Sequence, residues 1–300
     1  MFRYGVHKAT WGQLFDLDNP GLFFRQAAQT GAEVVELRPP DYVIMGDKRK
    51  IDELRVMARD SGIELIFCFG YPTGLDMRSD DPFIRKYAVE HMKRSIEGIA
   101  ALGEGGGELS GVLYSCWPTL YDGNAITRQM KYEHTQRCIE GIRHVMPTAE
   151  ALGVQINLEV LNRFENYIIN TAREGLDFAK AVDSKSCGLL LDTFHMAIEE
   201  DDIPAAIRSA GGYLGKLHAT EPNRKIPFHN NRIHWPCVGD ALRDIGFSGS
   251  VVIEAVVAFE DAGSHNMRMW RDQLEDVTAE GRIEALKAGI AFLRASFQEH

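Results

Sequence analysis

Asn157-Leu-Glu159 is the first of four segments from which the fold is predicted. The other three are Leu190-Leu-Asp192, Lys216-Leu-His218 and Val252-Ile-Glu254. Each segment is a short apolar run that ends in a carboxylate or an imidazole. The intervals between the four polar residues are 33, 26 and 36 residues, and each is about the length of one strand-plus-helix unit. Successive parallel strands of a barrel bring their C-terminal ends to one rim, so the spacing predicts that these side chains meet there.

Strand-like runs recur along the whole chain, and most are continuously apolar, which is typical of parallel strands buried on both faces. We predict strands at Tyr4–Thr10, Val34–Arg38, Glu64–Gly70, Gly111–Trp117, Gln155–Leu161, Gly188–Phe194, Leu214–Thr220 and Ser250–Val257. Eight is the number that a closed (β/α)8 TIM barrel requires. Amphipathic patterns predict long helices at 82–102, 132–152 and 283–297. No linker divides the chain, so we expect residues 1–300 to form a single barrel domain.

The composition limits the possible classes of protein. Hydrophobic residues make up 45% and charged residues 25% of the chain, as in ordinary globular domains. No apolar run reaches the ~18 residues that a transmembrane helix needs, and the first residues lack a signal-peptide pattern. The five cysteines are scattered without a CxxC pair, which favours reduced thiols and a cytoplasmic protein. The net charge of −10 argues against a nucleic-acid partner.

The four polar strand ends have the composition of a metal site. Two glutamates, one aspartate and one histidine form an oxygen-rich set that suits Mn²⁺, Mg²⁺ or Co²⁺. A divalent ion that chelates an α-hydroxy ketone acts as a Lewis acid and stabilises the enediolate left when the α-proton departs. Glu159 and Glu254 come from well-separated strands, so they are candidates for removing and returning a proton on opposite faces of the sugar.

Further polar residues follow the same strand ends at short intervals. Glu165 follows the first candidate ligand by six positions, His195 follows the second by three, and Arg224 follows the third by six. An arginine and a neutral histidine near a ligand oxygen can polarise a carbonyl or hold hydroxyl groups. We therefore expect these three residues near the substrate. Cys68, near the end of the third predicted strand, fits either a core position or the wall of a pocket.

Three longer motifs carry a resemblance to a known family. The segments Asn162-Arg-Phe-Glu-Asn-Tyr167, Leu191-Asp-Thr-Phe-His-Met-Ala-Ile-Glu-Glu200 and His218-Ala-Thr-Glu-Pro-Asn-Arg224 closely resemble those of the ketose 3-epimerases, a group of the xylose-isomerase-like barrels that includes D-tagatose, D-allulose (psicose) and L-ribulose 3-epimerases. The motifs cover about half of the chain.

The resemblance implies a mechanism and roles for particular residues. It implies a free ketose as substrate and one divalent ion as cofactor, with Mn²⁺ preferred over Mg²⁺ or Co²⁺. It further implies C3 epimerisation through a cis-enediolate and assembly as a homodimer or homotetramer. The four strand-end residues would be the ligands, and the two glutamates would double as the acid–base pair. The implied ligands are Glu159, Asp192, His218 and Glu254; the implied substrate contacts are Glu165, His195 and Arg224 at the O1–O3 end and Trp117 against the sugar. The helical segment at about 262–298 is a candidate subunit contact.

The chain departs from the family pattern at two places. The family commonly follows its last ligand with Pro-Phe, whereas this chain has Ala255-Val256. At the end of the first strand the family usually has an aromatic residue, whereas this chain has His7 followed by Lys8. In the family these positions contact the distal part of the ketose. The resemblance therefore predicts the C3 chemistry without naming the sugar.

Other functions remain open at this stage. An inosose dehydratase-like lyase or an aldose–ketose isomerase would use the same metal barrel. An apurinic-site endonuclease shares the barrel but needs a histidine-rich trinuclear site and a basic face, which this acidic chain lacks. A sugar-binding protein without catalysis is possible on any enzyme fold. His229 and His234 are a weaker candidate for a second metal site.

Overall fold

The computed structural model describes residues 2–17, 19–119, 125–228 and 232–297. Eight parallel strands close into a barrel in chain order, with β1 hydrogen-bonded to both β2 and β8. The strands are β1 (Arg3–His7), β2 (Val34–Leu37), β3 (Glu64–Cys68), β4 (Gly107–Gly111), β5 (Val154–Glu159), β6 (Cys187–Asp192), β7 (Leu214–His218) and β8 (Ser250–Ile253). The predicted (β/α)8 fold is confirmed.

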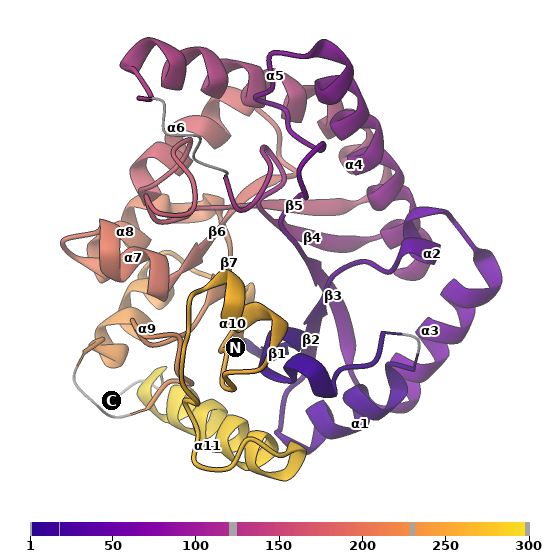
Figure 1. Ribbon diagram of the computed structural model, residues 1–300, viewed down its shortest axis with the longest axis vertical. Coiled ribbons are helices and arrows are strands. Elements are labelled where there is room, and N and C mark those ends of the chain that lie inside the picture. Colours follow the sequence, from indigo (N-terminus) through magenta and orange to yellow (C-terminus); the bar gives the residue numbers. More distant parts are fainter. Residues whose placement is uncertain (1, 18, 120–124, 229–231, 298–300) are drawn as a thin grey trace.

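Helices surround the barrel and cover its outer face (Figure 1). They are α1 (Gly21–Gln29), α2 (Asp41–Ile44), α3 (Lys48–Asp60), α4 (Pro82–Leu102), α5 (Arg128–Leu152), α6 (Ala172–Val182), α7 (Thr193–Glu199), α8 (Ile203–Ala210), α9 (Trp235–Asp244), α10 (Ala262–Asn266) and α11 (Ala279–Phe297). Three short 3₁₀ helices are η1 (Lys8–Thr10), η2 (Gly12–Leu14) and η3 (Gly211–Tyr213). None of these helices is long and apolar enough to span a bilayer.

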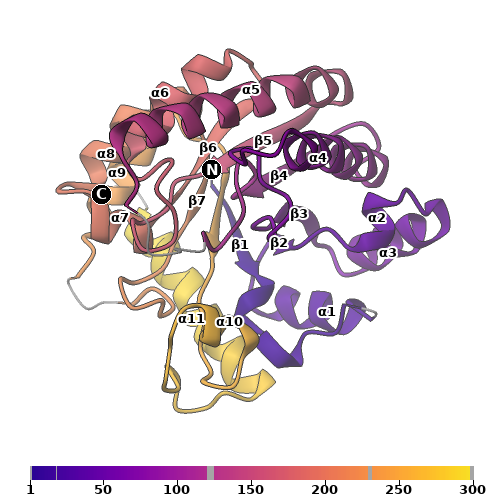
Figure 2. The ribbon, with the colours of Figure 1, turned by 45° about the horizontal axis from the view of Figure 1, so that its top comes forward.

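The long helices begin and end where local chemistry predicts. The Asp81 carboxylate accepts a hydrogen bond from the backbone N–H of Phe83 and caps α4, whose first residue is Pro82. Thr171 caps α6 in the same way through Glu174 N. Helix α5 ends at Gly153, which adopts the left-handed conformation that glycine tolerates. Helices α4 and α5 lie side by side against the β4–β5 part of the barrel (Figure 2).

The fourth strand was predicted too far along the chain, at 111–117, whereas β4 spans Gly107–Gly111. The apolar-run criterion failed because Glu108 and Ser110 are polar residues buried in this strand. Gly111 then turns the chain out of the sheet with φ +113°, and a Cβ there would lie 2.3 Å from the carbonyl oxygen of Phe69. The following apolar residues are buried in a loop over the barrel mouth, which explains their strand-like composition.

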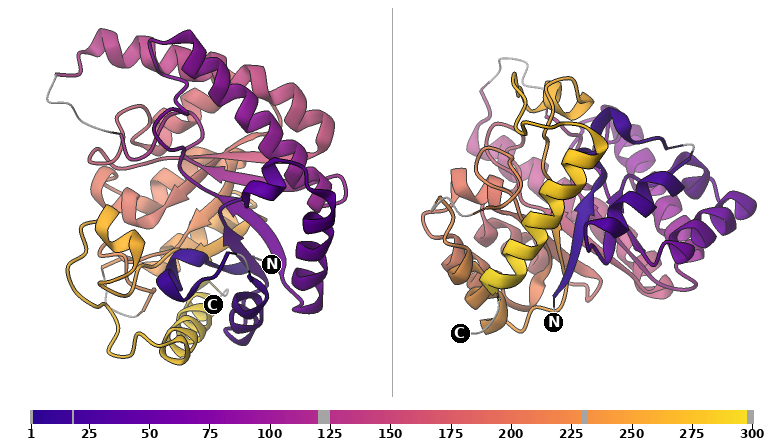
Figure 3. Two further views of the ribbon diagram at one scale, coloured as in Figure 1. Left: turned by 45° about the vertical axis from the view of Figure 1, so that its right-hand side comes forward. Right: turned by 90° about the horizontal axis from the view of Figure 1, so that it is seen from below.

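The other seven strands lie where the sequence predicted them but end earlier, because the last residues of each run belong to loops at the C-terminal rim or, after β1 and β6, to the short helices η1 and α7. After β8 the chain passes through α10 and returns as α11, the yellow helix that runs along the outside of the barrel (Figure 3). A buried ion pair between Arg282 and Asp261, 2.8 Å apart, ties α11 to the start of α10. The placement of the 262–298 segment at a subunit contact stays a prediction.

Candidate metal centre and substrate cavity

The four candidate ligands leave the same rim of the barrel. Glu159, Asp192 and His218 are the last residues of β5, β6 and β7, and Glu254 directly follows β8. The strand register pairs Asp192 with His218 and His218 with Val252, and side chains two residues apart on a strand share a face. The structure therefore places all four side chains on the inner face of the barrel at its C-terminal end.

The four side chains form one compact cluster whose geometry fits a divalent ion. One potential ligand atom of each lies within 4.8 Å of the others, and all four residues are buried or nearly so. Metal–ligand distances of about 2.1 Å separate opposite ligand atoms by about 4.2 Å, so only a small contraction is needed. Three carboxylates and one imidazole form the donor set that Mn²⁺, Mg²⁺ and Co²⁺ accept. The role of these residues as ligands stays a prediction.

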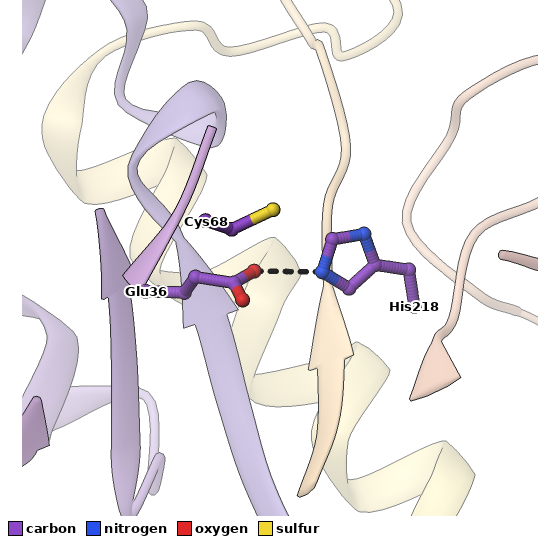
Figure 4. Close-up of side chains that lie close together, drawn as sticks. All are labelled: Glu36, Cys68 and His218. Atoms are coloured by element: carbon purple, nitrogen blue, oxygen red, sulfur yellow. Dashed lines mark hydrogen bonds and ion pairs between the residues drawn. The ribbon is translucent and has the colours of Figure 1, made fainter. Parts of the chain in front are cut away.

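His218 is oriented from inside the barrel by Glu36, a fully buried residue of β2 (Figure 4). Nε2 of the imidazole lies 2.7 Å from the Glu36 carboxylate, and Nδ1 lies 3.1 Å from Oε2 of Glu254. A metal-binding histidine usually donates its second N–H to a carboxylate, which fixes the ring and its tautomer. The hydrogen bond to Glu36 therefore leaves Nδ1 as the nitrogen that faces the candidate metal site.

Glu36 belongs to a buried charge network beneath the site. Its carboxylate is bonded to the ammonium of Lys216, which also lies 2.7 Å from Glu108 on β4. Lys216 and Glu36 are both fully buried. Burial alone would raise the pKa of Glu36, but the charges of Lys216 and His218 lower it to about 2. The network keeps this carboxylate ionised where it supports His218.

Cys68 lies beside Glu36 and His218 in the same view (Figure 4). Three residues of these types can bind a metal ion, but here Glu36 already bonds to Lys216 and His218. Burial raises the pKa of the Cys68 thiol well above its ordinary value, so the sulfur carries its proton. We therefore interpret Cys68 as part of the cavity wall.

The residues expected near the substrate form one connected group beside the cluster. The Trp117 indole donates to Glu165 over 2.8 Å, and Asn162 donates to the other oxygen of Glu165 over 2.9 Å. Asn162 also lies 2.8 Å from Nδ1 of His195, whose Nε2 lies 3.6 Å from Glu159. Asn162 thus holds the carboxylate and the imidazole in a fixed relation.

Arg224 connects this group to the candidate ligands. Its guanidinium donates to Asp192, and to Oε2 of Glu254 over 3.0 Å. The guanidinium also stacks 4.1 Å from the centre of the Phe194 ring. The backbone of Arg224 has φ +60°, a conformation that costs a non-glycine residue free energy and that persists where surrounding contacts enforce it.

The two glutamates that face each other have different proton affinities. Burial raises the pKa of Glu159, although the nearby imidazole of His195 opposes the shift. Burial would also raise the pKa of Glu254, but Arg224 and His218 hold it well below its ordinary value. Environments that separate the pKa values of two carboxyl groups in this way are typical of an acid and a base acting on one substrate.

A cavity of about 260 Å³ opens above the cluster. All six predicted substrate contacts line it: His7, Cys68, Trp117, Glu165, His195 and Arg224. The two catalytic candidates, Glu159 and Glu254, also line it, whereas Asp192 and His218 lie beneath. Val256, at the position of the family's aromatic residue, belongs to the wall as well. The cavity therefore gives a small polar molecule access to both glutamates.

His7 lines the cavity beside Glu254, with Nδ1 3.6 Å from Oε1 of that residue. The backbone N–H of Ala9 donates to the same nitrogen. Burial lowers the pKa of His7 to about 4, so the imidazole is neutral at pH 7. The suggested second metal site at His229 and His234 is not tested, because His229 lies outside the described residues.

Several residues of the site were missed by the sequence argument. Glu36 and Lys216 are charged residues inside apolar strands, which is the same signal that identified the four candidate ligands. Glu108 was overlooked because its strand was misplaced. Lys8 and Arg38, which directly follow β1 and β2, also line the cavity. No sequence signal separates these two from ordinary loop cations.

The fold and the site define a known class of barrel enzyme. The sequence model of the xylose isomerase-like TIM barrel family matches residues 24–292, so the chain belongs to that family. A D-psicose 3-epimerase of Ruminiclostridium cellulolyticum is 40% identical over 274 residues, covering 90% of this chain and 89% of that protein. A D-psicose 3-epimerase of Agrobacterium fabrum is 31% identical, covering 97% and 98%.

A solved structure supports the same placement. The D-psicose 3-epimerase of Clostridium cellulolyticum H10, crystallised with D-tagatose, matches with a TM-score of 0.91 and 36% identity, covering 99% of this chain and 100% of that one. Within the xylose isomerase-like barrels, this chain is a member of the ketose 3-epimerase family, as its motifs predicted, and it is a sugar epimerase.

Proposed function

We propose that the protein epimerises a ketose at C3 with the help of one bound divalent ion, Mn²⁺ in preference to Mg²⁺ or Co²⁺. The observation that carries the proposal is the pair Glu159 and Glu254, which reach one cavity from β5 and β8 with carboxylate oxygens within 4.8 Å of each other. Two such groups are needed to invert a centre, because one removes the proton and the other returns it on the opposite face. The relatives named as D-psicose 3-epimerases support this choice of reaction.

The protein groups prepare the proton transfers. Arg224 favours the ionised form of Glu254, which is therefore suited to accept the C3 proton, and Glu159 reaches the same cavity from β5 and is placed to return a proton. In the reverse direction the roles exchange. A bound divalent ion, held by Glu159, Asp192, His218 and Glu254, would supply Lewis-acid polarisation of the substrate carbonyl.

Other groups position the sugar and keep water away. Glu165 and His195, joined by Asn162, offer an acceptor and an imidazole for the hydroxyl groups at the carbonyl end. The half-buried indole of Trp117 offers an apolar face to the sugar ring carbons. Arg224 lies close enough to both Glu159 and Glu254 to interact with their charges, so it is placed to stabilise negative charge that develops on the substrate oxygens.

The direct test is proton exchange at C3. Metal-loaded protein would be incubated with D-fructose, D-tagatose and L-ribulose in D₂O, and the products followed by NMR. A C3 epimer that carries deuterium at C3 supports the proposal. Loss of water to a deoxy product would instead indicate the lyase, and deuterium at C1 with an aldose product would indicate the aldose–ketose isomerase.

The role of the glutamate pair has its own test. Glu254→Gln should keep the fold and lower kcat by at least about 10³-fold, because the amide cannot accept the C3 proton. Exposed Glu64, at the opposite end of the barrel in β3, provides a matched control, and Glu64→Gln should leave kcat unchanged. Turnover of Glu254→Gln within tenfold of the unmodified enzyme would refute the assignment.

A further inference from the structure

The cavity carries a second set of charged side chains, on the wall opposite to Glu165 and His195. Lys8 directly follows β1 and Arg38 directly follows β2, and both residues line the cavity. In the pairing of β1 with β2, His7 lies opposite Glu36. Lys8 follows His7 by one position and Arg38 follows Glu36 by two, so the two cations lie on neighbouring strand ends at the rim. In a ring of eight strands, β1 and β2 lie across the barrel from β5 and β6.

The positive charge on this wall is balanced only in part by the described residues of the protein. Among the described residues, no carboxylate lies within 4.0 Å of the Lys8 ammonium, which lies over the ring of Phe15, 5.9 Å from its centre. Arg38 pairs with Asp41 over 3.0 Å, but Asp41 is 79% exposed and does not line the cavity. An exposed pair of this kind contributes little and occupies only one of the five guanidinium donors.

The two cations also repel each other. Burial lowers the pKa of Lys8 and the charge of Arg38 lowers it further, although the charge of Glu254 opposes the shift. Lys8 is partly buried and Arg38 is 54% exposed at the edge of the cavity, and an anion between these like charges would relieve their repulsion. Neither charge is needed for the C3 chemistry, which takes place at Glu159 and Glu254.

We propose that this wall binds an anionic group of the substrate, so that the enzyme acts on a ketose with a phosphate or a carboxylate at its terminal carbon. The inference rests on the proposed function, which places the reacting carbons between Glu159 and Glu254. A ketose whose carbonyl end contacts Glu165 and His195 extends across the cavity towards Lys8 and Arg38. Arg38 would hold two anion oxygens with its planar fork, and Lys8 would add a point charge.

Three sugars of one configuration test the proposal. D-Fructose, D-fructose 6-phosphate and D-fructuronate have the same centres from C3 to C5 and differ in the terminal group, which is a hydroxyl, a phosphate or a carboxylate. The value of kcat/KM for C3 exchange would be measured for each by NMR in D₂O. We expect at least one anionic sugar to exceed D-fructose by about tenfold or more, and the better of the two identifies the anion.

Variants of the two cations show whether the preference arises at this wall. Lys8→Met and Arg38→Met should each lower the ratio of anionic to neutral kcat/KM by on the order of 10- to 100-fold, the range expected for a lost charged hydrogen bond. Lys8→Arg should retain most of the ratio. Lys48→Met is the matched control, because this lysine is 89% exposed on α3, and its ratio should not change.

The outcomes separate this inference from the proposed function. The anion site is refuted if kcat/KM for C3 exchange is as high with D-fructose as with both anionic sugars. It is also refuted if the ratio of anionic to neutral kcat/KM is unchanged in Lys8→Met and Arg38→Met. If no sugar exchanges at C3, the proposed function fails, and calorimetry with D-glucitol 6-phosphate and D-glucitol, which cannot epimerise, decides the anion site. The site is supported if D-glucitol 6-phosphate binds more tightly than D-glucitol and if Lys8→Met weakens the binding of the phosphate. Equal binding of the two polyols overturns it.

Discussion

Replacing Lys216 by Met should destabilise the whole barrel, although methionine keeps most of the apolar part of the side chain and the main loss is the ammonium group. Lys216 is fully buried in β7 and balances two carboxylates, those of Glu36 and Glu108. Without the ammonium, Glu36 and Glu108 lose the cation that they share, although Glu36 keeps its contact with the imidazole of His218. Removing one partner of a buried ion pair costs about 3–5 kcal/mol, mostly through the charge that is left behind.

The expected shift in melting temperature follows from the size of the protein. An unfolding entropy of about 2.1 cal/mol/K per residue amounts to about 0.6 kcal/mol/K for a chain of this length. A loss of 3–5 kcal/mol therefore lowers Tm by roughly 5–8 °C, which differential scanning calorimetry measures easily. Adding Glu108→Gln to the Lys216→Met variant removes one of the two unbalanced charges and should recover part of the loss.

The control is Lys48→Met on α3, where the ion pair with Asp52 is exposed. Such a pair contributes about 0.5 kcal/mol or less, so Tm should change by no more than about 1 °C. If Lys216→Met melts within 1 °C of the unmodified protein, the electrostatic reasoning is wrong. If Glu108→Gln gives no recovery, the loss comes from packing and not from charge.

The remaining predictions concern the groups that support the cluster. Glu36→Gln should keep the fold and weaken Mn²⁺ binding on the order of 10- to 100-fold, because the imidazole of His218 loses its ionised partner; equal calorimetric affinities would contradict this role. Burial would raise the pKa of Glu36, but Lys216 and His218 lower it from 4.5 to about 2. Its stabilising contribution is therefore complete above about pH 4.5 and is lost as the pH falls towards 2, so Glu36→Gln should flatten the dependence of Tm on pH in this window; parallel curves for the two proteins would exclude the effect. Asn162→Ala should raise KM for the ketose by about tenfold, because the amide holds both Glu165 and His195; an unchanged KM in steady-state kinetics would show that these two side chains position themselves.

Local sequence patterns predicted most of the barrel because each strand is buried on both faces and each long helix has its own capping residues. Asp81 with Pro82, and Thr171, mark helix starts that depend only on neighbouring backbone groups. The predicted position of β4 was wrong, because polar residues of this strand are buried and their partners come from distant strands. Apolar periodicity cannot detect a strand whose buried side chains are neutralised by Lys216, more than one hundred positions away.

The sequence by itself determined the eightfold strand–helix order and the four polar strand ends, because a closed parallel barrel brings every strand end to one rim whatever lies between. The tertiary structure alone decided which charges meet. Glu36 faces His218 across 182 positions of chain, and Lys8 stands beside Arg38 at one wall of the cavity. Such encounters depend on the closure of the barrel and on the register of its strands, which no local pattern encodes.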